Sequence, residues 1–383
     1  MRVNRRILLL SVSAGAGHVR AAEALEATVQ ALAGEGRNVE AKHLDVMDYV
    51  PSSFRRIYAD FYLSLITRYP RLWGMLYRIT GDTRPDAVTQ RMRRTIERLN
   101  TRRLRTAIAE FAPDAIVCTH FLPAEMLMRQ IRKGRVTAPV YLQVTDFDLH
   151  RMWVVPEMTG YFAASAEIAH RMRAVGLPAD RVHDSGIPVM PAFAETHDRR
   201  ELAVSFGLDP EMPTYLIMGG GAGVGALDEL ADSLLKETEG FQLIVLAGRN
   251  AELLERLRAL AAGRHAGRLF PQGFTRHVER LMACSDLAIT KPGGLTTSEC
   301  LSMGLPMIVN APIPGQEERN ADYLLEQGAA WKAIDHVALA WRLRALQQDP
   351  ARRTEMAARA RAIGRPHAAR AVIDTVLARL DAS

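Results

Sequence analysis

The stretch Thr290 to Asn310, TKPGGLTTSECLSMGLPMIVN, says most about the fold of this chain. An apolar segment, DLAIT at 286–290, runs into a glycine pair, after which Thr296 and Thr297 favour the start of a helix that carries Glu299. A strand, a glycine turn and a helix N-terminus present backbone N–H groups and a positive dipole end to a phosphate. A carboxylate one turn into such a helix is placed to bind a ribose diol. The stretch predicts a nucleotide diphosphate site, and an ordinary βα turn with a capping threonine is the alternative.

The same alternation of apolar and helical segments extends over the whole chain and predicts a doubly wound α/β fold, formed twice. The first series of strands ends near a Pro- and Ala-rich passage at 188–196, and the second begins with TYLIMGG at 214–220. We therefore expect a domain boundary close to residue 195. The predicted strands are RRILLLSV, NVEAKHLD, DAIVCTH, APVYLQVTD, GYFAAS and RVHDSGIP in the first series, and TYLIMGG, FQLIVLAG, GRLFPQG, DLAIT and PMIVN in the second.

Several motifs, in order, resemble those of the glycosyltransferases that make bacterial and plastid glycolipids, the monogalactosyldiacylglycerol synthases and processive diacylglycerol glucosyltransferases. The resemblance implies a GT-B fold, in which two Rossmann-like domains with parallel sheets face a cleft. It implies an acceptor- and membrane-binding domain over 1–195, with a C-terminal helix (361–383) that packs back on it. A nucleotide-sugar-binding domain would span 196–360. The motifs are SAGAGHVRAAEAL (13–25), DVMDYV (45–50), VTDFDLHRMW (144–153), MGGGAGVG (218–225), AGRN (247–250), GFTRHVERLMACSDLAITKPGGLTTSE (273–299) and PGQEERNA (314–321).

Composition agrees with a two-domain intracellular enzyme. The 383 residues are 48% hydrophobic, enough for two cores, and the three cysteines show neither paired spacing nor a metal pattern. The apolar run near the start is only about seven residues long and leads into a glycine loop, so it predicts a first strand and not a signal peptide. No window has the roughly 20 apolar residues of a membrane-spanning helix.

The segment 51–105 combines aromatic and basic residues. Trp73 and Tyr77 continue an aromatic stripe at helical spacing, and Arg93 and Arg94 belong to a block of eight arginines between 84 and 105. This mixture favours contact with an anionic membrane surface. A buried aromatic stripe beside a solvated basic face is the alternative. Aromatic and basic residues can also bind nucleic acid, but no nucleic-acid-binding motif is present, so we expect no such partner.

His18 is the candidate catalytic residue, because it follows the first glycine loop at the start of a helix. A helix N-terminus lowers the pKa of an imidazole and keeps it neutral, as a general base must be. A capping role is the alternative from spacing alone. The resemblance favours the base, since the matching histidine of similar enzymes activates or orients the acceptor. A dinucleotide fingerprint fits poorly because Arg20 stands where its third glycine would be.

The resemblance also assigns residues to the donor and acceptor sides. It implies that Phe274 and Thr275 bind the uracil, that Glu299 binds the ribose, and that Gln316 and Glu317 bind the transferred sugar, with Asn320 in support. Backbone groups of the two glycine turns, with Arg249 as a cation, would stabilise the leaving diphosphate. These turns supply Gly220, Gly221, Gly294, Leu295 and Thr296. On the acceptor side the resemblance implies Asp146, His150 and Trp153, and a core position is the alternative for Trp153.

The resemblance implies an inverting hexosyltransferase that uses a UDP-sugar and diacylglycerol or a monoglycosyldiacylglycerol. We expect no cofactor, since the DFD triplet at 146–148 falls in the acceptor half and is not read as a metal site. The enzyme would be cytoplasmic and peripherally bound to the inner face of the membrane through anionic lipids. A UDP-sugar epimerase or hydrolase on the same fold, and a catalytically silent membrane-binding module, remain as alternatives. Nothing in the sequence separates glucose, galactose and glucuronate as the transferred sugar.

Overall fold

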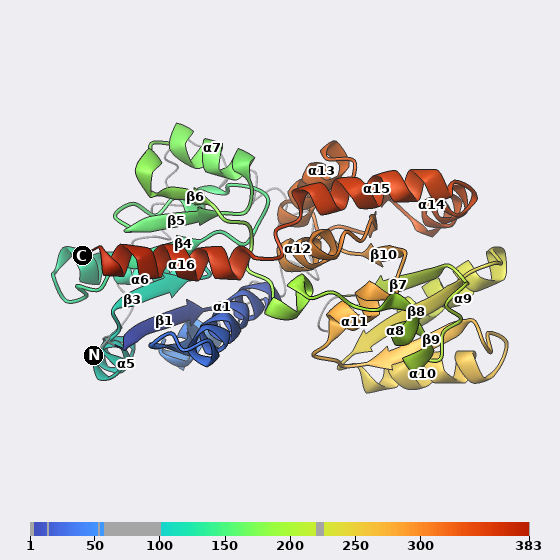
Figure 1. Cartoon of the computed structure of the whole chain (residues 1–383), viewed down its shortest axis with the longest axis horizontal. Coiled ribbons are helices and arrows are strands. Elements are labelled where there is room, and N and C mark those ends of the chain that lie inside the picture. The colour runs from blue at the N-terminus through green and yellow to red at the C-terminus, as the bar shows by residue number, and fades with distance from the viewer. Residues whose placement is uncertain (1–3, 14, 53, 57–100, 220–225, 383) are drawn as a thin grey trace. The chain divides into compact units, whose positions relative to one another are not determined.

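The computed structural model describes residues 4–13, 15–52, 54–56, 101–219 and 226–382 (Figure 1). The chain divides into two compact units, each described by itself below. The first unit comprises Met1–Pro191, Ile313–Arg319 and Arg365–Ser383, and the second comprises Ala192–Pro312 and Asn320–Gly364.

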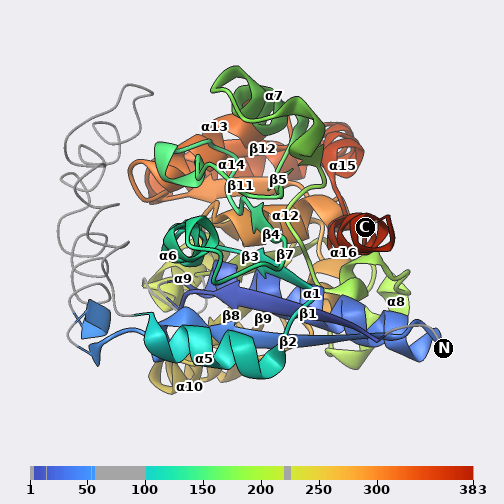
Figure 2. The ribbon, with the colours of Figure 1, turned by 90° about the vertical axis from the view of Figure 1, so that its left-hand side faces the viewer.

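The first unit is built on a parallel sheet in the order β2-β1-β3-β4-β5-β6, counted over the described residues. Its strand β1, next to the edge strand β2, has a run of leucines buried on both faces, as expected where helices cover both sides of a parallel sheet. Leu9 pairs with His43 of β2 and with Val117 of β3, and β1 and β2 lie side by side in Figure 2. The strands are β1 (Arg5–Ser11), β2 (Val39–Asp45), β3 (Ala115–Cys118), β4 (Val140–Gln143), β5 (Gly160–Ala163) and β6 (Val182–Asp184).

Five helices of the first unit lie within the described residues, and the last of them closes its core. They are α1 (Ala16–Gly34), α5 (Arg102–Phe111), α6 (Phe121–Arg132), α7 (Ala166–Ala174) and α16 (Ala368–Asp381). Helix α16 packs against α1 with Val372, Ile373 and Val376 fully buried. Arg370 pairs with Glu35 at 3.2 Å. The end of the chain is thus part of the first unit, although it follows the second in sequence.

The second unit has a parallel sheet in the order β12-β11-β10-β7-β8-β9 over the described residues. Read from its first strand, this is the strand order of dinucleotide-binding folds, and the order reverses between β7 and β10. The strands are β7 (Thr214–Met218), β8 (Gln242–Gly248), β9 (Leu269–Gly273), β10 (Leu287–Thr290), β11 (Met307–Asn310) and β12 (Ala330–Ala333).

The helices of the second unit are linked by a series of mutual contacts, among them one between α14 and α15. Helix α9 contacts both α10 and α14, whereas α11 contacts α8 and α12, and α12 contacts α15. The core between α9, α10, α14 and the sheet contains Tyr215, Phe241 and Leu343, all fully buried. The helices are α8 (Arg199–Ser205), α9 (Leu227–Glu237), α10 (Ala251–Ala262), α11 (Val278–Ala283), α12 (Gly294–Met303), α13 (Gln316–Glu326), α14 (His336–Gln348) and α15 (Pro350–Ile363). Helix α13 begins in the first unit and continues into the second.

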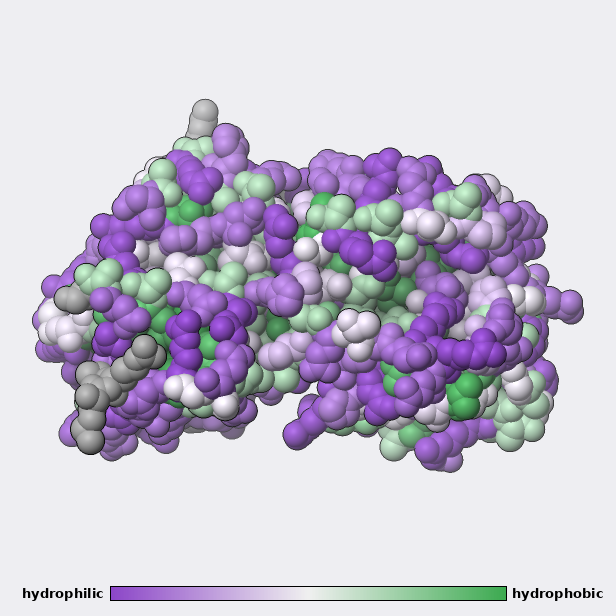
Figure 3. Space-filling model, in the orientation of Figure 1, coloured by the Kyte–Doolittle hydropathy of each residue, from purple (hydrophilic) through white to green (hydrophobic). Residues whose placement is uncertain are grey.

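The predicted class, α/β with two doubly wound parallel sheets, is confirmed. Hydrophilic residues cover most of the described surface of each unit on the face drawn in Figure 3, with smaller apolar groups between them. In the part of the chain that the structure describes, no helix is both long enough and apolar enough to cross a bilayer.

Gly364 ends α15 where the chain leaves the second unit, and it has no room for a side chain. A Cβ atom added there would lie 2.3 Å from the carbonyl oxygen of Leu301 in α12, a backbone atom that cannot turn away. We therefore expect Gly364→Ala to destabilise the second unit by about 1–3 kcal/mol, measured by urea unfolding. Gly34→Ala is the matched control, since nothing lies within 4 Å of its added Cβ. Equal stability of the two variants would show that α15 and α12 can separate without cost.

Candidate active site

His18 lies in the first turn of α1, where β1 delivers the chain to the carboxyl edge of the first sheet. Gly15 precedes the helix with φ 142°, a value that favours glycine. Thr119 follows β3 at the same edge, and its hydroxyl donates to the His18 carbonyl oxygen at 2.8 Å. The backbone N–H of Thr119 donates in turn to Leu10 of β1 at 3.0 Å. The histidine is therefore held by the two strands at which the strand order reverses, the usual place of a ligand in such sheets.

The contacts of the imidazole favour the tautomer with its hydrogen on Nδ1. His18 Nδ1 lies 3.2 Å from the carbonyl oxygen of Thr119 and 2.8 Å from Oγ1 of Thr145. Because a carbonyl oxygen can only accept, Nδ1 carries the hydrogen. In the neutral ring Nε2 then keeps its lone pair, which is the form that a general base requires.

Burial lowers the pKa of His18 to about 4, although the bond to the Thr119 carbonyl opposes this shift. His120, which follows Thr119, packs edge-on against His18 with ring centroids 4.5 Å apart. Burial, and secondarily the charge on His18, hold the pKa of His120 well below its usual range. Both rings are therefore neutral at pH 7, and neither repels a cation or attracts an anion by charge.

The low pKa of His18 predicts a loss of stability in mild acid. An unfolded histidine titrates near pH 6.5, so between about pH 4 and pH 6.5 the unfolded state binds the extra proton. Stability should therefore fall as the pH drops through this window and level off below it. In urea unfolding at pH 7.5 and pH 5, we expect His18→Ala to lose less stability on acidification than the unchanged chain. An identical loss in both would show that His18 is as readily protonated in the folded state as in the unfolded one.

Aromatic rings enclose the two histidines. Trp153 is buried, with its ring centroid 6.1 Å from that of His18 and 5.9 Å from that of His120. Phe121, at the start of α6, meets Trp153 at right angles with centroids 5.6 Å apart. Trp153 is thus a buried core residue that also packs beside the imidazole. A core position and a position on the acceptor side, the two alternatives from the sequence, are therefore compatible. The neighbouring His150 is buried and caps the turn Arg151–Trp153 by accepting from Met152 N–H at 3.2 Å.

Asp146 and Gln316, assigned to different substrates from the sequence, meet in the structure. Gln316 Nε2 donates to Asp146 Oδ1 at 2.5 Å, and both residues belong to the first unit. Asp148, the other carboxylate of the DFD triplet, pairs with Arg171 at 2.9 Å. Each carboxylate therefore has a protein partner. Among the described residues no cluster of three or more histidine, cysteine, aspartate or glutamate side chains is arranged to hold a metal ion.

In the second unit, β10 leads through the glycine pair into α12. The helix begins at Gly294 with Gly293 as its N-cap and no side-chain cap, two residues earlier than the threonines indicated. Its first backbone N–H groups therefore lack a capping side chain, and Leu295 and Thr296 stand in the first turn. Glu299 is 7% exposed on this helix. Asn320, fully buried, donates to the Pro292 carbonyl oxygen at 3.0 Å and so ties α13 to the turn before α12.

A cavity of about 520 Å³ opens at the carboxyl edge of the second sheet, across the point where the strand order reverses. Its size suits a small-molecule ligand. Its lining joins the ends of β7, β10 and β11 to the starts of α9 and α14, and it includes Met218, Gly219, Ala226, Leu227, Thr290, Lys291, Asn310, Ala311 and His336. None of the predicted donor residues that the structure describes lines this cavity, although Lys291 stands only three positions before Gly294.

Other predicted donor residues lie on loops after the strands. The Arg249 guanidinium stacks over the Phe274 ring, 4.6 Å from its centroid, and that ring is 54% exposed. Thr275 Oγ1 accepts from His277 N–H at 3.0 Å, which orders the loop after β9. Glu317 accepts from Ile313 N–H at 2.7 Å and closes the loop before α13. Arg249 and Phe274 thus form an exposed stacked pair. Thr275 and Glu317 instead accept hydrogen bonds from backbone N–H groups and so fix the conformation of their loops.

Six predicted site residues fall outside the described residues, so the structure does not place them. They are Gly220 and Gly221 of the glycine-rich turn, and Trp73, Tyr77, Arg93 and Arg94 of the aromatic and basic segment.

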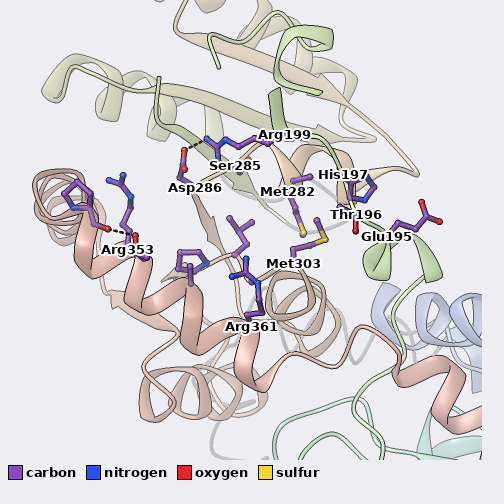
Figure 4. A pocket seen from close by; sticks show the side chains of 17 residues that line it. Glu195, Thr196, His197, Arg199, Met282, Ser285, Asp286, Met303, Arg353 and Arg361 are labelled. Carbon is purple, nitrogen blue, oxygen red and sulfur yellow. Dashed lines mark hydrogen bonds and ion pairs between the residues drawn. The ribbon is translucent and has the colours of Figure 1, made fainter. Parts of the chain in front are cut away.

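A second cavity, of about 550 Å³, lies at the opposite, amino-terminal edge of the second sheet (Figure 4). Several of its charged groups serve the fold: Arg199 pairs with Asp286 at 2.7 Å, and Asp286 also accepts from Thr214 N–H. Arg353 donates to the Leu346 carbonyl oxygen at 2.9 Å. Because ligands of such sheets bind at the carboxyl ends of the strands, this cavity is not the candidate site.

Sequence reasoning missed Thr119, His120 and Thr145, which position or contact His18. Two of them stand 101 and 127 residues from it. A signal was available, because Thr119 and His120 close the predicted strand DAIVCTH and Thr145 is the next-to-last residue of APVYLQVTD. The carboxyl ends of neighbouring parallel strands meet at one edge, so polar residues there gather with those of the first loop.

Two protein families match successive parts of the chain. The profile described as "Monogalactosyldiacylglycerol (MGDG) synthase" matches residues 18–189. That of the "Glycosyltransferase family 28 C-terminal domain" matches residues 214–372. Curated relatives carry the name processive diacylglycerol beta-glucosyltransferase. That of Bacillus subtilis (strain 168) is 29% identical over 86% of this chain and 84% of its own length. That of Bacillus mycoides (strain KBAB4) is 28% identical over 98% of this chain and 94% of its own length.

Solved structures of the same fold are much more distant in sequence. MurG of Acinetobacter baumannii has a TM-score of 0.61 at 17% identity, over 97% of this chain and 99% of its own. The UDP-GlcNAc 2-epimerase of Neisseria meningitidis bound to UDP-GlcNAc scores 0.62 at 16% identity, with the same coverage. The S. aureus MnaA–UDP structure has a TM-score of 0.63 at 14% identity, over 98% of this chain and 97% of its own. These likenesses show the fold class, GT-B, and at this identity the fold alone.

Proposed function

Because the chain belongs to the glycosyltransferase family of the monogalactosyldiacylglycerol synthases and processive diacylglycerol glucosyltransferases, we propose that it glycosylates a lipid. The reaction moves a hexose from a UDP-sugar to diacylglycerol, or to a monoglycosyldiacylglycerol, with inversion at the anomeric carbon. The observation that carries this proposal is the neutral, Nδ1-protonated imidazole of His18 at the carboxyl edge of the first sheet.

The second unit supplies the sugar-nucleotide side. The uncapped N-terminus of α12 offers Gly294, Leu295 and Thr296 N–H groups to the diphosphate, and the buried carboxylate of Glu299 accepts from the ribose. The exposed pair of Arg249, after β8, and Phe274, after β9, suits a flat base and an anionic phosphate. The name of the epimerase structure includes UDP-GlcNAc and that of the MnaA structure includes UDP, which supports a UDP donor.

The first unit supplies the acceptor side. His18 Nε2 takes the proton of the acceptor hydroxyl as its oxygen bonds to the anomeric carbon, and the bond from that carbon to the diphosphate breaks. The bonds of Nδ1 to Thr119 and Thr145 hold the ring in the basic tautomer. Trp153 and Phe121 keep water from one side of the imidazole. The hydrogen bond between Gln316 and Asp146 holds these two polar side chains together, next to Thr145 in sequence, and in this proposal they bind hydroxyls of the sugar.

No metal or cofactor is needed in this proposal. The positive charge for the leaving diphosphate comes from the α12 dipole and Arg249. Both carboxylates of the DFD triplet have protein partners, which supports the proposal that the triplet does not hold a metal ion. The enzyme would meet its lipid as a peripheral protein at the inner face of the membrane, drawn by anionic lipids to the 51–105 segment.

A panel of radiolabelled UDP-glucose, UDP-galactose and UDP-glucuronate with diacylglycerol vesicles, resolved by thin-layer chromatography, tests the proposal. We expect a labelled glycolipid from one of these sugars, and we expect excess EDTA to leave the yield of this glycolipid unchanged. A second, slower product would identify extension to two sugars. Label that stays water-soluble with every sugar would contradict the assignment.

An epimerase or hydrolase of UDP-sugars is favoured by one observation, the likeness to UDP-GlcNAc 2-epimerase structures. Such an enzyme would change the soluble UDP-sugar without lipid. Incubation with each UDP-sugar in the absence of vesicles, followed by NMR of the sugar, separates it from the transferase. A silent membrane-binding module would bind no UDP in calorimetry.

A further inference from the structure

Three large apolar side chains form an exposed ridge on the second unit. Ile334, Val337 and Trp341 are 79%, 65% and 59% exposed, and only three other large apolar side chains of the described residues are comparably exposed. Ile334 stands between β12 and the N-cap Asp335, while Val337 and Trp341 lie four residues apart on one face of α14. Isolated exposed apolar residues are ordinary, but such a cluster on one short stripe marks a contact surface.

The charges around the ridge are mostly positive. The Arg342 guanidinium lies 5.9 Å from the centre of the Trp341 ring, Arg344 is exposed one turn further, and Lys332 precedes the ridge on β12. The single carboxylate of the segment, Asp335, is engaged as the N-cap of α14 and accepts from Ala338 N–H at 2.7 Å. A tryptophan with arginines beside it is typical of the interface between lipid headgroups and acyl chains.

The small apolar area of the ridge favours a membrane over a protein as its partner. Three partly exposed side chains offer on the order of 300 Å² of apolar surface, well below the roughly 800 Å² that each partner buries in a stable protein interface. Insertion into a bilayer requires no complementary surface, and each basic residue near anionic lipid adds about 1 kcal/mol. The surface therefore fits an anionic bilayer better than a second copy of the chain.

We infer that the second unit has its own membrane contact, in which Ile334, Val337 and Trp341 enter the headgroup region of an anionic bilayer. The ridge begins where β12 ends, at the same edge of the sheet as the 520 Å³ cavity, and His336 lines that cavity while Val337 belongs to the ridge. This contact is additional to the membrane segment proposed in the first unit. It would hold the sugar-nucleotide side of the second unit at the lipid surface.

A fluorescent label on the ridge tests the contact directly. The three native cysteines are fully buried, and burial raises the pKa of each thiol, so an introduced cysteine is labelled selectively. Val337→Cys carries the environment-sensitive fluorophore NBD, and Ala259→Cys on exposed α10 is the matched control. With phosphatidylglycerol vesicles we expect a blue shift and quenching by acyl-chain nitroxide lipids at position 337 and neither at 259.

A second variant measures how much the ridge contributes. Val337→Ser combined with Trp341→Ser should weaken partition into phosphatidylglycerol vesicles roughly tenfold, while UDP affinity, on which the proposed function depends, stays unchanged. An unquenched label at 337 on a vesicle-bound protein, or unchanged partition of the double variant, would overturn the inference. A blue shift that grows with protein concentration without vesicles would assign the ridge to a second copy instead.

Discussion

Replacement of His18 by alanine should reduce turnover roughly 10²- to 10⁴-fold, the usual contribution of a general base. The imidazole is neutral at pH 7 because burial lowers its pKa to about 4. Its Nδ1 hydrogen is committed to Thr119 and Thr145, so Nε2 is the nitrogen left to take a proton. Removal of the ring removes the base and leaves the second unit intact. UDP affinity, measured by calorimetry, should therefore remain close to normal.

His170→Ala is the control, since this histidine is exposed on α7 and lies outside the site. It should retain full turnover and full UDP affinity. The unchanged enzyme should also keep its activity as the pH falls below 6.5, because a base with a pKa near 4 stays unprotonated there. An equal loss of UDP binding in His18→Ala would place the histidine on the donor side and remove its role as the base.

Long buried strands were predictable from sequence because their apolar runs have few alternatives. Every strand expected from RRILLLSV to PMIVN is present. The strand β12, Ala330–Ala333, was not expected, since its sequence AWKA is interrupted by Lys332 and forms no apolar run. It lies at the edge of its sheet, where one side of the strand has no neighbour and a charged residue is tolerated.

The site was less predictable than the fold, because its contacts join residues that are far apart in sequence. The position of His18 followed from the glycine loop, but its tautomer depends on Thr119 and Thr145, which no local pattern connects to it. The bond between Asp146 and Gln316 spans 170 residues and unites two motifs that had been given separate roles. The roles of Trp73, Tyr77, Arg93 and Arg94 lie outside the described residues and stay predictions.

Replacement of Glu299 by alanine should weaken UDP binding about 10- to 150-fold. A charge-assisted hydrogen bond contributes roughly 1.5–3 kcal/mol, and every 1.4 kcal/mol is about tenfold in affinity. Glu299 is 7% exposed on α12, so its carboxylate sits in a setting where little water replaces a lost ligand bond. Calorimetric titration of the variant with UDP measures the effect, and thermal unfolding checks that α12 is still folded.

Two neighbouring variants make this measurement specific. Glu299→Gln keeps the volume and one acceptor oxygen but loses the charge, so its UDP affinity should fall between those of the alanine variant and the unchanged enzyme. Ser298→Ala removes a buried hydroxyl that bonds to Gly294 within the same helix at 2.9 Å, and it should bind UDP nearly normally. Equal affinity in all three variants would mean that the ribose is bound elsewhere. The α12 N-terminus would then serve only as a backbone turn, and the cavity between the ends of β7, β10 and β11 would become the better candidate for the nucleoside.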